Sequence, residues 1–362
     1  MVEWKKLGFF SVVQKTKNKK HITENAYSIT QAGLVPTKSF FNEKTNITSK
    51  DTSGYYIVEK DWFVYSPSRI DVGSINYLKD EGPVIVSPID VVFSIDQSIC
   101  MPSFLLSYFF TYSGRKALLK NIEGVEGMGR RNLPFDAIKN MLIPIPSLEE
   151  QKRIMGILDT FTASIDNLKE QIAQRRKQYE YYRDQLLDLE GKEGVEMKTL
   201  GDVSIKISSG KNKSKSKEGK YPVFGSTGII AFSDSFIYEV PMILVARVGA
   251  NAGYVHLSHG KYDVTDNTLI INLREEVEQK YIYYNLIKEN INQYARGGGQ
   301  PLITASILKS IIVPIPPLSE QSRIVSILDT FEASISNLEA QLAQRQKQYE
   351  YYRNQLLTFE EG

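Results

Sequence analysis

The feature of this 362-residue chain that most restricts its fold is an internal repeat. Residues 144–190 and 314–360 are identical at 33 of 47 positions, without a gap. A short phrase also recurs before each intervening stretch, as VEWKKLG at Val2–Gly8 and as VEMKTLG at Val195–Gly201. The chain is therefore a tandem duplication, and each copy consists of a leading phrase, a variable body and a shared tail.

The shared tails have the heptad pattern of a coiled coil. Apolar side chains recur from Ile154 and from Ile324 in alternating steps of four and three residues, over about five heptads. Residues 147–150 fit a capping box at the start of the first helix. The predicted helix–helix seam consists of Ile165, Leu168, Ile172, Arg175, Tyr179, Tyr182 and Leu186 in the first tail, and of Ile335, Leu338, Leu342, Arg345, Tyr349, Tyr352 and Leu356 in the second.

Two seam positions carry arginine where an apolar residue is expected. Arg175 and Arg345 either fix the register of the pairing, as single polar seam residues do, or pack only their stems while the guanidinium groups reach water. The seam tyrosines are expected to pack in the core, with their hydroxyl groups at its edge. Tyr181 lies off the seam and is a candidate contact for a partner protein.

Two near-identical helices in one chain pack most simply about a pseudo-twofold axis, which makes them antiparallel. The two bodies would then lie at opposite ends of a stiff helical rod. The tails must match because the rod pairs with itself, whereas the bodies are free to differ. The same symmetry predicts that the chain ends lie close together, with Gly362 near Met1, as the linker 191–194 joins its flanks at the internal junction.

Each body is predicted to be mixed α/β. Strands are expected at 55–58, 62–65, 84–86 and 91–93 in the first body and at 242–245 and 268–271 in the second, helices at 103–119 and 276–294, and glycine-rich turns at 127–130 and 297–300. The predicted fold class is thus two mixed α/β globular domains joined by two long antiparallel coiled-coil helices, as a pseudo-twofold tandem repeat. The predicted boundaries are 1–146 for the first globular domain, 147–194 for the central helix and linker, 195–316 for the second globular domain, and 317–362 for the C-terminal helix.

Composition excludes several classes of protein. The single cysteine, Cys100, permits no internal disulfide and favours a reducing compartment, the cytoplasm. The first ten residues lack the pattern of a signal peptide, and no stretch is apolar for long enough to span a membrane. No nucleotide-binding loop, hydrolase motif or metal motif is present, and His256 and His259 have no cysteine nearby, so no catalytic, cofactor or metal site is predicted.

Basic residues in loops are the main chemical signal. The net charge is only +2, so any nucleic-acid binding must come from local patches. Lysines cluster soon after both leading phrases and suit phosphate contacts, whereas arginine and glutamine can read base edges. Solvated loops and arginines that brace a domain are the alternatives, but the recurrence of the lysines in two divergent bodies favours DNA. The candidate DNA-binding residues are Lys15, Lys17, Lys19, Lys20, Arg69, Arg130, Arg131, Lys211, Lys213, Lys215, Lys217, Arg247, Arg296 and Gln300.

The chain resembles the specificity subunit of Type I restriction–modification enzymes over residues 2–361. The resemblance rests on two tails that read P-x-P-x-L-x-E-Q-x-R-I-x-x-I-L-D, at Pro144–Asp159 and Pro314–Asp329. It also rests on body phrases such as FVYSPSRIDVGSI (Phe63–Ile75) and ILVARVGANAGYV (Ile243–Val255). The resemblance implies a non-catalytic subunit whose two domains bind a bipartite, asymmetric double-stranded DNA sequence, with an unread gap set by the helices.

The resemblance also implies partners. These are two modification (methyltransferase) subunits and, in the full complex, restriction subunits. S-adenosylmethionine, ATP and magnesium would belong to those partners. A rival interpretation from the residues alone is a bivalent scaffold whose bodies bind two proteins, while a self-contained methyltransferase is disfavoured because its catalytic and cofactor motifs are missing.

Overall fold

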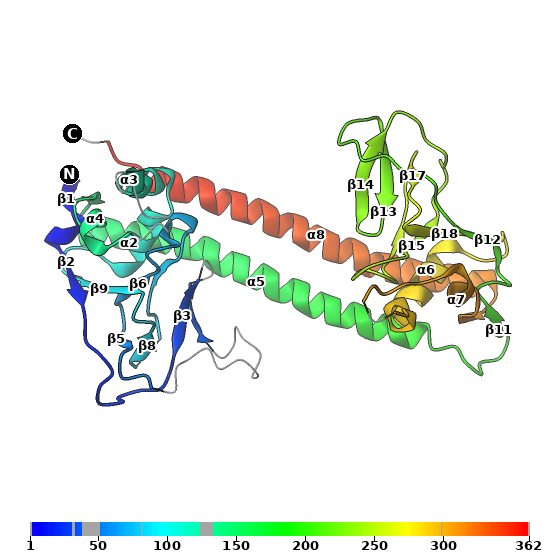
Figure 1. Cartoon of the computed structure of the whole chain (residues 1–362), viewed down its shortest axis with the longest axis horizontal. Coiled ribbons are helices and arrows are strands. Elements are labelled where there is room, and N and C mark those ends of the chain that lie inside the picture. Colours follow the sequence, from blue (N-terminus) through cyan, green and yellow to red (C-terminus); the bar gives the residue numbers. More distant parts are fainter. Residues whose placement is uncertain are drawn as a thin grey trace. The chain divides into compact units, whose positions relative to one another are not determined.

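Figure 1 shows the computed structural model of the chain, which divides into two compact units. Unit 1 comprises residues 1–168 and 341–362, and unit 2 comprises residues 169–340. The structure describes residues 2–30, 33–37, 51–80, 82–123, 133–297 and 299–360, with side chains left undescribed at 121–123. Each unit contains one body together with part of each of two long helices, α5 (Leu148–Leu186) and α8 (Leu318–Leu356).

The body of unit 1 is a set of short strands followed by helices. Its strands are β1 (Glu3–Lys6), β2 (Ser11–Gln14), β3 (Tyr27–Thr30), β4 (Gly33–Pro36), β5 (Tyr56–Val58), β6 (Phe63–Tyr65), β7 (Ile75–Tyr77), β8 (Val84–Val86), β9 (Val91–Ile95) and β10 (Leu142–Ile145). Its helices are α2 (Pro102–Phe109), α3 (Tyr112–Glu123) and α4 (Phe135–Ile138), with short 3₁₀ turns η1 (Leu7–Phe9) and η2 (Ile70–Val72).

The body of unit 2 follows a similar order. Its strands are β11 (Glu196–Thr199), β12 (Ser204–Ser209), β13 (Tyr221–Gly225), β14 (Gly228–Ser233), β15 (Ile243–Ala246), β16 (Val255–Leu257), β17 (Asp263–Val264), β18 (Thr268–Leu273) and β19 (Ile312–Ile315). Its helices are α6 (Gln279–Glu289), η3 (Ile291–Tyr294) and α7 (Ala305–Lys309). No helix in the described ranges is long and apolar enough to cross a membrane.

The four-stranded sheets of the two bodies share one topology. The order is β2–β9–β6–β7 in unit 1 and β12–β18–β15–β16 in unit 2, with every neighbouring pair antiparallel. The hairpins β6–β7 and β15–β16 also agree in spacing, since Tyr65 pairs with Ile75 and Val245 pairs with Val255. The fold repeats although the sequences match only faintly, because a core accepts different apolar residues when their volume and pattern are kept.

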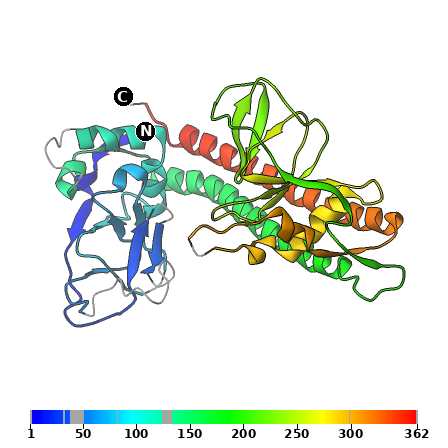
Figure 2. The same cartoon turned by 45° about the vertical axis from the view of Figure 1, so that its right-hand side comes forward.

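The two faces of each sheet bury different clusters. In unit 2, Val245 and Ile271 belong to the large core that includes α6, α7 and the long helices, while Leu244 and Ile270 pack with Tyr262 and Val264. Alternate residues of a strand point to opposite faces, so both faces are covered. Figure 2 shows the β13–β14 hairpin on one side of the unit 2 sheet and α6 and α7 on the other. Unit 1 repeats this arrangement, with a large core and a smaller second cluster.

The predicted strands are present within one or two residues, but the two predicted body helices are each interrupted. The prediction of one helix at 103–119 is wrong, because α2 ends at Phe109 and α3 starts at Tyr112. The Thr111 hydroxyl donates to the Tyr108 carbonyl at 2.7 Å and accepts from the Gly114 N–H at 2.9 Å, which forms a turn there. In the region predicted as one helix, 276–294, the α-helix α6 ends at Glu289, because Asn290 adopts a left-handed conformation with φ of +50°.

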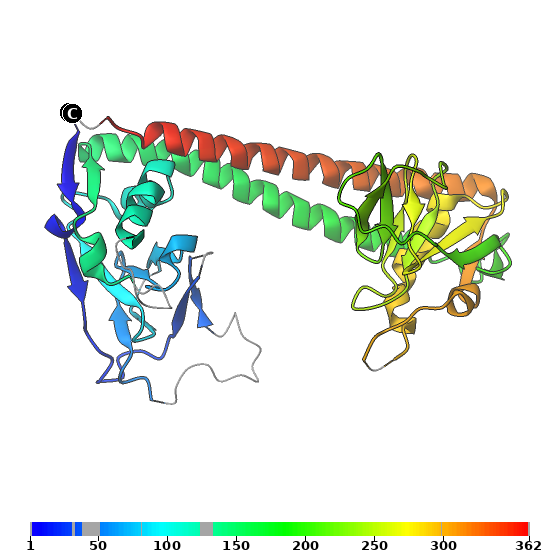
Figure 3. The same cartoon turned by 45° about the horizontal axis from the view of Figure 1, so that its top comes forward.

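Both leading phrases pair with the Pro-Ile-Pro segments that end the bodies. β1 pairs with β10, so Trp4 lies opposite Pro144, and β11 pairs with β19, so Met197 lies opposite Pro314. Figure 3 shows β1 and β10 side by side. The Trp4 indole N–H also donates to the Glu360 carbonyl at 3.3 Å, so the described parts of the two end segments are in contact. The predicted pair, Gly362 and Met1, lies outside the described residues.

A buried glutamine anchors the start of each long helix. The Gln151 amide oxygen accepts from the Met101 N–H at 2.8 Å, and its nitrogen donates to the carbonyls of Ile99 and Pro146 at 2.9 and 3.0 Å. Gln321 repeats the pattern with the Glu278 N–H at 2.8 Å and the Pro316 carbonyl at 2.9 Å. These bonds attach each helix to its body.

The predicted capping interaction is present at the start of α5. The Ser147 hydroxyl accepts from the Glu150 N–H at 3.3 Å. The Glu150 carboxylate does not complete a reciprocal box, because it pairs with Arg153 at 2.7 Å. Pro317 occupies the corresponding position before α8.

The two long helices pack against each other in both units, and an equivalent aromatic cluster marks each contact. In unit 1 the Phe161 and Tyr352 rings stack with centroids 5.2 Å apart, and the Arg345 guanidinium lies 5.7 Å from the Phe161 centroid. In unit 2 the Phe331 and Tyr182 rings stack at 5.4 Å, and Arg175 lies 5.8 Å from the Phe331 centroid. Both seam arginines therefore place the guanidinium over a ring of the other helix.

The contacts also give the helix direction. In unit 2, Arg176 pairs with Glu339 at 2.5 Å, while the later residue Tyr182 stacks on the earlier residue Phe331, so the helices are antiparallel. The seam side chains are buried or half-buried in the described structure, except Tyr182 and Tyr352, which are 46% and 43% exposed. The predicted fold class, with two mixed α/β bodies and two long antiparallel helices, is confirmed.

A polar network attaches the unit 2 body to both helices. Lys280 and the Tyr284 hydroxyl of α6 each donate to Asp329 of α8 at 2.6 Å. The Tyr179 hydroxyl of α5 donates to Glu332 of α8 at 3.5 Å. Burial raises the pKa of the Glu332 carboxyl, and the nearby Asp329 charge acts in the same direction. In unit 1 the position equivalent to Glu332 is Thr162, so this network belongs to unit 2.

Candidate nucleic-acid interface

Three loops of unit 2 meet at one end of its four-stranded sheet. The first is the hairpin loop, residues 246–254, between β15 and β16. The second is the glycine-rich loop, residues 296–302, which follows η3. The third is the lysine loop, residues 210–220, which follows β12. Main-chain hydrogen bonds join the hairpin loop to the glycine-rich loop, and join the lysine loop to the strands β17 and β18.

The hairpin loop and the glycine-rich loop of unit 2 are held together directly. The Ile303 N–H donates to the Arg247 carbonyl at 2.8 Å, and the Gly249 N–H donates to the Pro301 carbonyl at 3.0 Å. The Arg247 N–H donates to the Asn267 carbonyl at 2.9 Å. Arg247 is thereby fixed at both its main-chain groups, and Gln300 lies in the loop beside it.

Asn212 is one of several groups that hold the lysine loop of unit 2 in place. The Asn212 amide donates to the Asp263 carboxylate at 2.7 Å and accepts from the Ser214 N–H at 2.7 Å. The Lys211 N–H also donates to the Val264 carbonyl at 3.0 Å. The lysine side chains are exposed at positions 211, 213, 215 and 217. The loop therefore has an ordered centre and cationic side chains that face water.

Unit 1 repeats this design. Lys17-Asn18-Lys19 matches Lys211-Asn212-Lys213, and Asn18 is fully buried. The Asn18 amide donates to the Thr23 carbonyl at 2.9 Å and accepts from the Ile22 N–H at 2.8 Å. Lys15, Lys17, Lys19 and Lys20 are exposed. The sequence interpretation singled out the lysines and missed the asparagines between them, although the repeated Lys-Asn-Lys triplet was a visible signal.

The hairpin loop of unit 1, residues 66–74, is also held like its counterpart. The Leu133 N–H donates to the Pro67 carbonyl at 3.1 Å, which corresponds to the bond between Ile303 and Arg247. Gly73 and Gly253 occupy the same place and have φ of +95° and +91°. Arg69 is exposed on this loop, whereas Arg130 and Arg131 lie outside the described residues.

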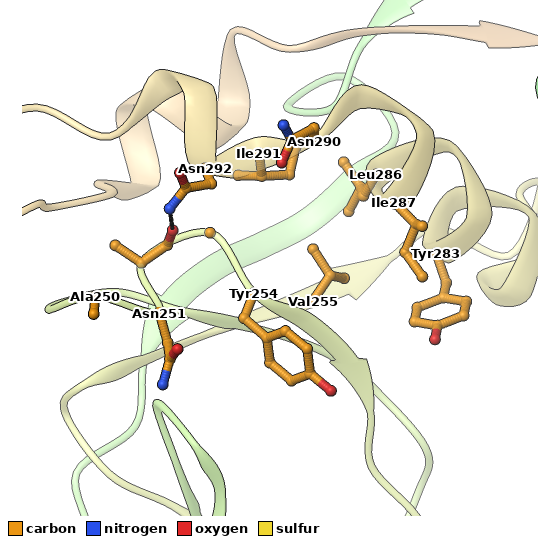
Figure 4. Close-up of a pocket in the computed structure, with 12 residues that line it drawn as sticks. Ala250, Asn251, Tyr254, Val255, Tyr283, Leu286, Ile287, Asn290, Ile291 and Asn292 are labelled. Carbon is orange, nitrogen blue, oxygen red and sulfur yellow. Dashed lines mark hydrogen bonds between the residues drawn. The ribbon is translucent and has the colours of Figure 1, made fainter. Parts of the chain in front are cut away.

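Each hairpin loop is bonded to a neighbouring helix. In unit 2 the Asn292 amide of η3 donates to the Ala252 carbonyl of the loop at 2.6 Å (Figure 4). A pocket of about 410 Å³ lies between the loop and the segment formed by α6 and η3, lined in part by Tyr254 and Tyr283. In unit 1 the Arg115 guanidinium donates to the Asp71 carbonyl of the loop. The loops are thus preorganised, which lowers the cost of ordering them on a ligand.

The predicted absence of a metal site can be compared with the described side chains. Within the described ranges, no group of three or more His, Cys, Asp or Glu side chains is placed to hold a metal ion. His256 lies between the rings of Phe224 and Tyr254, with centroids 5.4 and 5.7 Å away. Burial lowers the His256 pKa to about 4, so the imidazole is neutral at pH 7. The exposed groups of the loops include lysines, Arg69 and Arg296, which suit contacts with phosphates and base edges.

The sequence matches the family of Type I restriction modification DNA specificity domains over residues 1–175 and again over residues 192–346. The chain therefore belongs to this family, and the resemblance predicted from the repeated tails is confirmed.

Among curated relatives, the Type I restriction enzyme EcoprrI specificity subunit of Escherichia coli is 30% identical over 57% of this chain and 56% of its own length. The EcoR124I/EcoR124II specificity subunit of the same species is 33% identical over 65% of each chain. The matched region thus spans less than two thirds of these two relatives.

Solved structures show the same fold. The S subunit of a Type-I restriction-modification system from M. genitalium aligns with a TM-score of 0.62 at 15% identity, over 100% of this chain and 97% of that chain. A chain from a study of complex assembly and conformational transition of the type I R-M system aligns with a TM-score of 0.61 at 17% identity, over 98% of this chain and 96% of that chain.

Proposed function

We propose that this chain is the non-catalytic specificity subunit of a Type I restriction–modification complex. In this proposal each body binds one half of a bipartite, asymmetric sequence in double-stranded DNA. The observation that carries the proposal is the duplicated interface, in which both bodies place a Lys-Asn-Lys loop and an arginine-bearing hairpin loop on the same sheet topology. Two readers with different loop sequences on one chain suit a sequence with two different halves.

The exposed lysines would supply most of the binding free energy through phosphate contacts. Lysine is a flexible point charge, and each neutralised phosphate releases counterions whatever the base sequence. The proposed DNA contacts are Lys15, Lys17, Lys19, Lys20, Arg69, Arg130 and Arg131 in the first body, and Lys211, Lys213, Lys215, Lys217, Arg247, Arg296 and Gln300 in the second. The proposed domain boundaries remain 1–146, 147–194, 195–316 and 317–362.

The helices would set the unread gap between the two half-sites. Each helix has 39 residues and continuous helical structure. At 1.5 Å per residue each is roughly 58 Å long. A helix pair of this length would serve as the spacer between the two half-sites.

The duplicated helices also suit two copies of one partner. Tyr181 and Tyr351 are 61% and 60% exposed, and each ring lies edge-on to the neighbouring stacked tyrosine. Exposed aromatic rings of this kind are typical anchors of protein interfaces. We therefore propose two modification (methyltransferase) subunits, joined by restriction subunits in the full complex. S-adenosylmethionine, ATP and magnesium would be held by those partners, and the complex would act on DNA in the cytoplasm.

The test uses this chain together with its partner methyltransferase in a host that lacks other DNA modification. Modified-base sequencing should reveal one discontinuous sequence with two different halves. Replacing the four lysines at 211, 213, 215 and 217 by alanine should weaken DNA binding and lower the salt slope by about 0.9 for each phosphate that is no longer neutralised. The matched variant at 15, 17, 19 and 20 should behave likewise. A bivalent protein scaffold would give no modified sequence and no salt-dependent DNA binding.

A further inference from the structure

The arginines of this chain separate into two groups by what their side chains contact. Outside Arg130 and Arg131, the structure describes twelve arginines, and nine of them are used by the fold. Four pair with carboxylates, three lie over aromatic rings and two donate to main-chain carbonyls. The arginines paired with carboxylates are Arg153, Arg176, Arg183 and Arg323. Those over aromatic rings are Arg175, Arg345 and Arg353, and those that donate to main-chain carbonyls are Arg115 and Arg274.

The three remaining described arginines all lie on the loops of the candidate interface. Arg69 is on the hairpin loop of unit 1, Arg247 is on the hairpin loop of unit 2, and Arg296 is on the glycine-rich loop of unit 2. Arg69 and Arg296 are exposed, with no side-chain partner within the described ranges. The Arg247 guanidinium has one long hydrogen bond, 3.5 Å to the Asp266 carbonyl, and its Nε is buried without a partner.

An arginine with unused donors on a rigid loop has a definite chemistry. Guanidinium donors that the fold leaves unpaired can form hydrogen bonds with a ligand that supplies acceptors. The planar guanidinium presents paired donors that match the O6 and N7 atoms of guanine in the major groove. The neighbouring lysines lack this paired geometry and suit single phosphate contacts.

We propose that Arg69 in unit 1 and Arg247 and Arg296 in unit 2 determine base specificity, each by reading a guanine, whereas the lysine loops contact phosphates only. The inference rests on the proposed function and names the residues that set the recognised sequence. The arginine occupies a different position along each of the two hairpin loops. Arg69 lies four residues after Tyr65, whereas Arg247 lies two residues after Val245, the equivalent strand position. The same hairpin can therefore place its arginine at different base pairs in the two half-sites.

The test compares single alanine variants of the complete complex with its methyltransferase. Arg69→Ala should relax a G·C position in one half-site, and Arg247→Ala and Arg296→Ala should relax G·C positions in the other half-site only. Discrimination at each relaxed position should fall roughly ten- to hundredfold. Arg274→Ala is the matched control, because this exposed arginine of unit 2 donates to the Asp202 carbonyl and should leave the modified sequence unchanged.

A second measurement identifies the contacted atom. Replacing the assigned guanine by 7-deazaguanine removes the N7 acceptor. This should weaken binding by the unaltered complex and have no effect on the corresponding alanine variant. Arg247→Lys keeps the charge, so it should bind DNA with a similar salt slope but discriminate poorly, which separates loss of base reading from loss of folding.

Three results would overturn the inference. The first is that all three alanine variants keep the original modified sequence. The second is that an alanine variant loses affinity equally for every DNA sequence. The third is that Arg69→Ala relaxes the same half-site as Arg247→Ala or Arg296→Ala. If the unaltered complex modified no discontinuous sequence, the proposed function would fail instead.

Discussion

The buried glutamines at the helix starts offer a test of how the bodies are attached. Gln151→Leu replaces the amide by an apolar group of similar size. The main-chain groups of Met101, Ile99 and Pro146 would then be left without their partner in a fully buried site. The equivalent change, Gln321→Leu, leaves two main-chain groups without a partner.

The expected loss in the free energy of unfolding follows from the number of hydrogen bonds that each change removes. A buried polar group left unpaired costs about 1–3 kcal/mol, and the leucine side chain regains part of this through apolar burial. The free energy of unfolding should therefore fall by about 3–6 kcal/mol for Gln151→Leu and by about 2–4 kcal/mol for Gln321→Leu. With a urea m-value of about 2–3 kcal/mol/M, the first change should move the midpoint of unit 1 unfolding by about 1–3 M.

The two tryptophans make the assay specific to one unit. Trp4 and Trp62 both belong to unit 1, so tryptophan fluorescence reports its unfolding, while circular dichroism reports both units. Gln151→Leu should shift the fluorescence transition more than Gln321→Leu does. Gln344→Leu, at an exposed helix position, is the control and should change stability by less than about 0.5 kcal/mol. A fluorescence shift no larger than that of the control would refute the reasoning.

Three further outcomes are expected. Because the Glu332 pKa is raised in the folded protein, its contribution to stability is present below the unfolded glutamate pKa of about 4.3 and is lost as pH rises through the folded value. Glu332→Gln should thus unfold at a higher temperature than the unaltered protein at pH 7 but not at pH 4. Asp329→Asn removes the charged partner of Lys280, so it should unfold at a lower temperature than the unaltered protein at pH 7. A lower unfolding temperature for Glu332→Gln than for Asp329→Asn at pH 7 would contradict this account. Exchanging residues 202–313 for the body of a related subunit should change one half of the modified sequence, and a change in both halves would show that the bodies do not act separately. Inserting one heptad after Gln171 and another after Gln341 lengthens the helices by roughly 10 Å, or about three base pairs, so it should lengthen the gap or abolish specific binding, and modification at the original gap would exclude the helices as the spacer.

Some features of the interface were predictable from sequence and others were not. The lysine clusters were visible because they lie in short contiguous runs that recur after both leading phrases. The Lys-Asn-Lys triplet recurs in both bodies, but sequence does not show that Asn18 and Asn212 hold the loops, because an asparagine that fixes a loop is chemically the same as one that only faces water. The arginines posed the same problem, since Arg247 and Arg274 differ only in what surrounds them.

The duplication and the two long helices are predictable from the amino-acid sequence alone. Both are written in periodic, local patterns, since a heptad seam needs only residues three and four positions apart, and the repeat needs only comparison of the chain with itself. Only the packed structure shows that the leading phrases pair with the Pro-Ile-Pro segments, that both bodies have one sheet topology, and that the hairpin loop of unit 2 is bonded to its glycine-rich loop. These features depend on hydrogen bonds such as that between Ile303 and Arg247, which join residues more than fifty positions apart. No local pattern records such a pairing, because its geometry is set by the packed sheet and helices between the two residues.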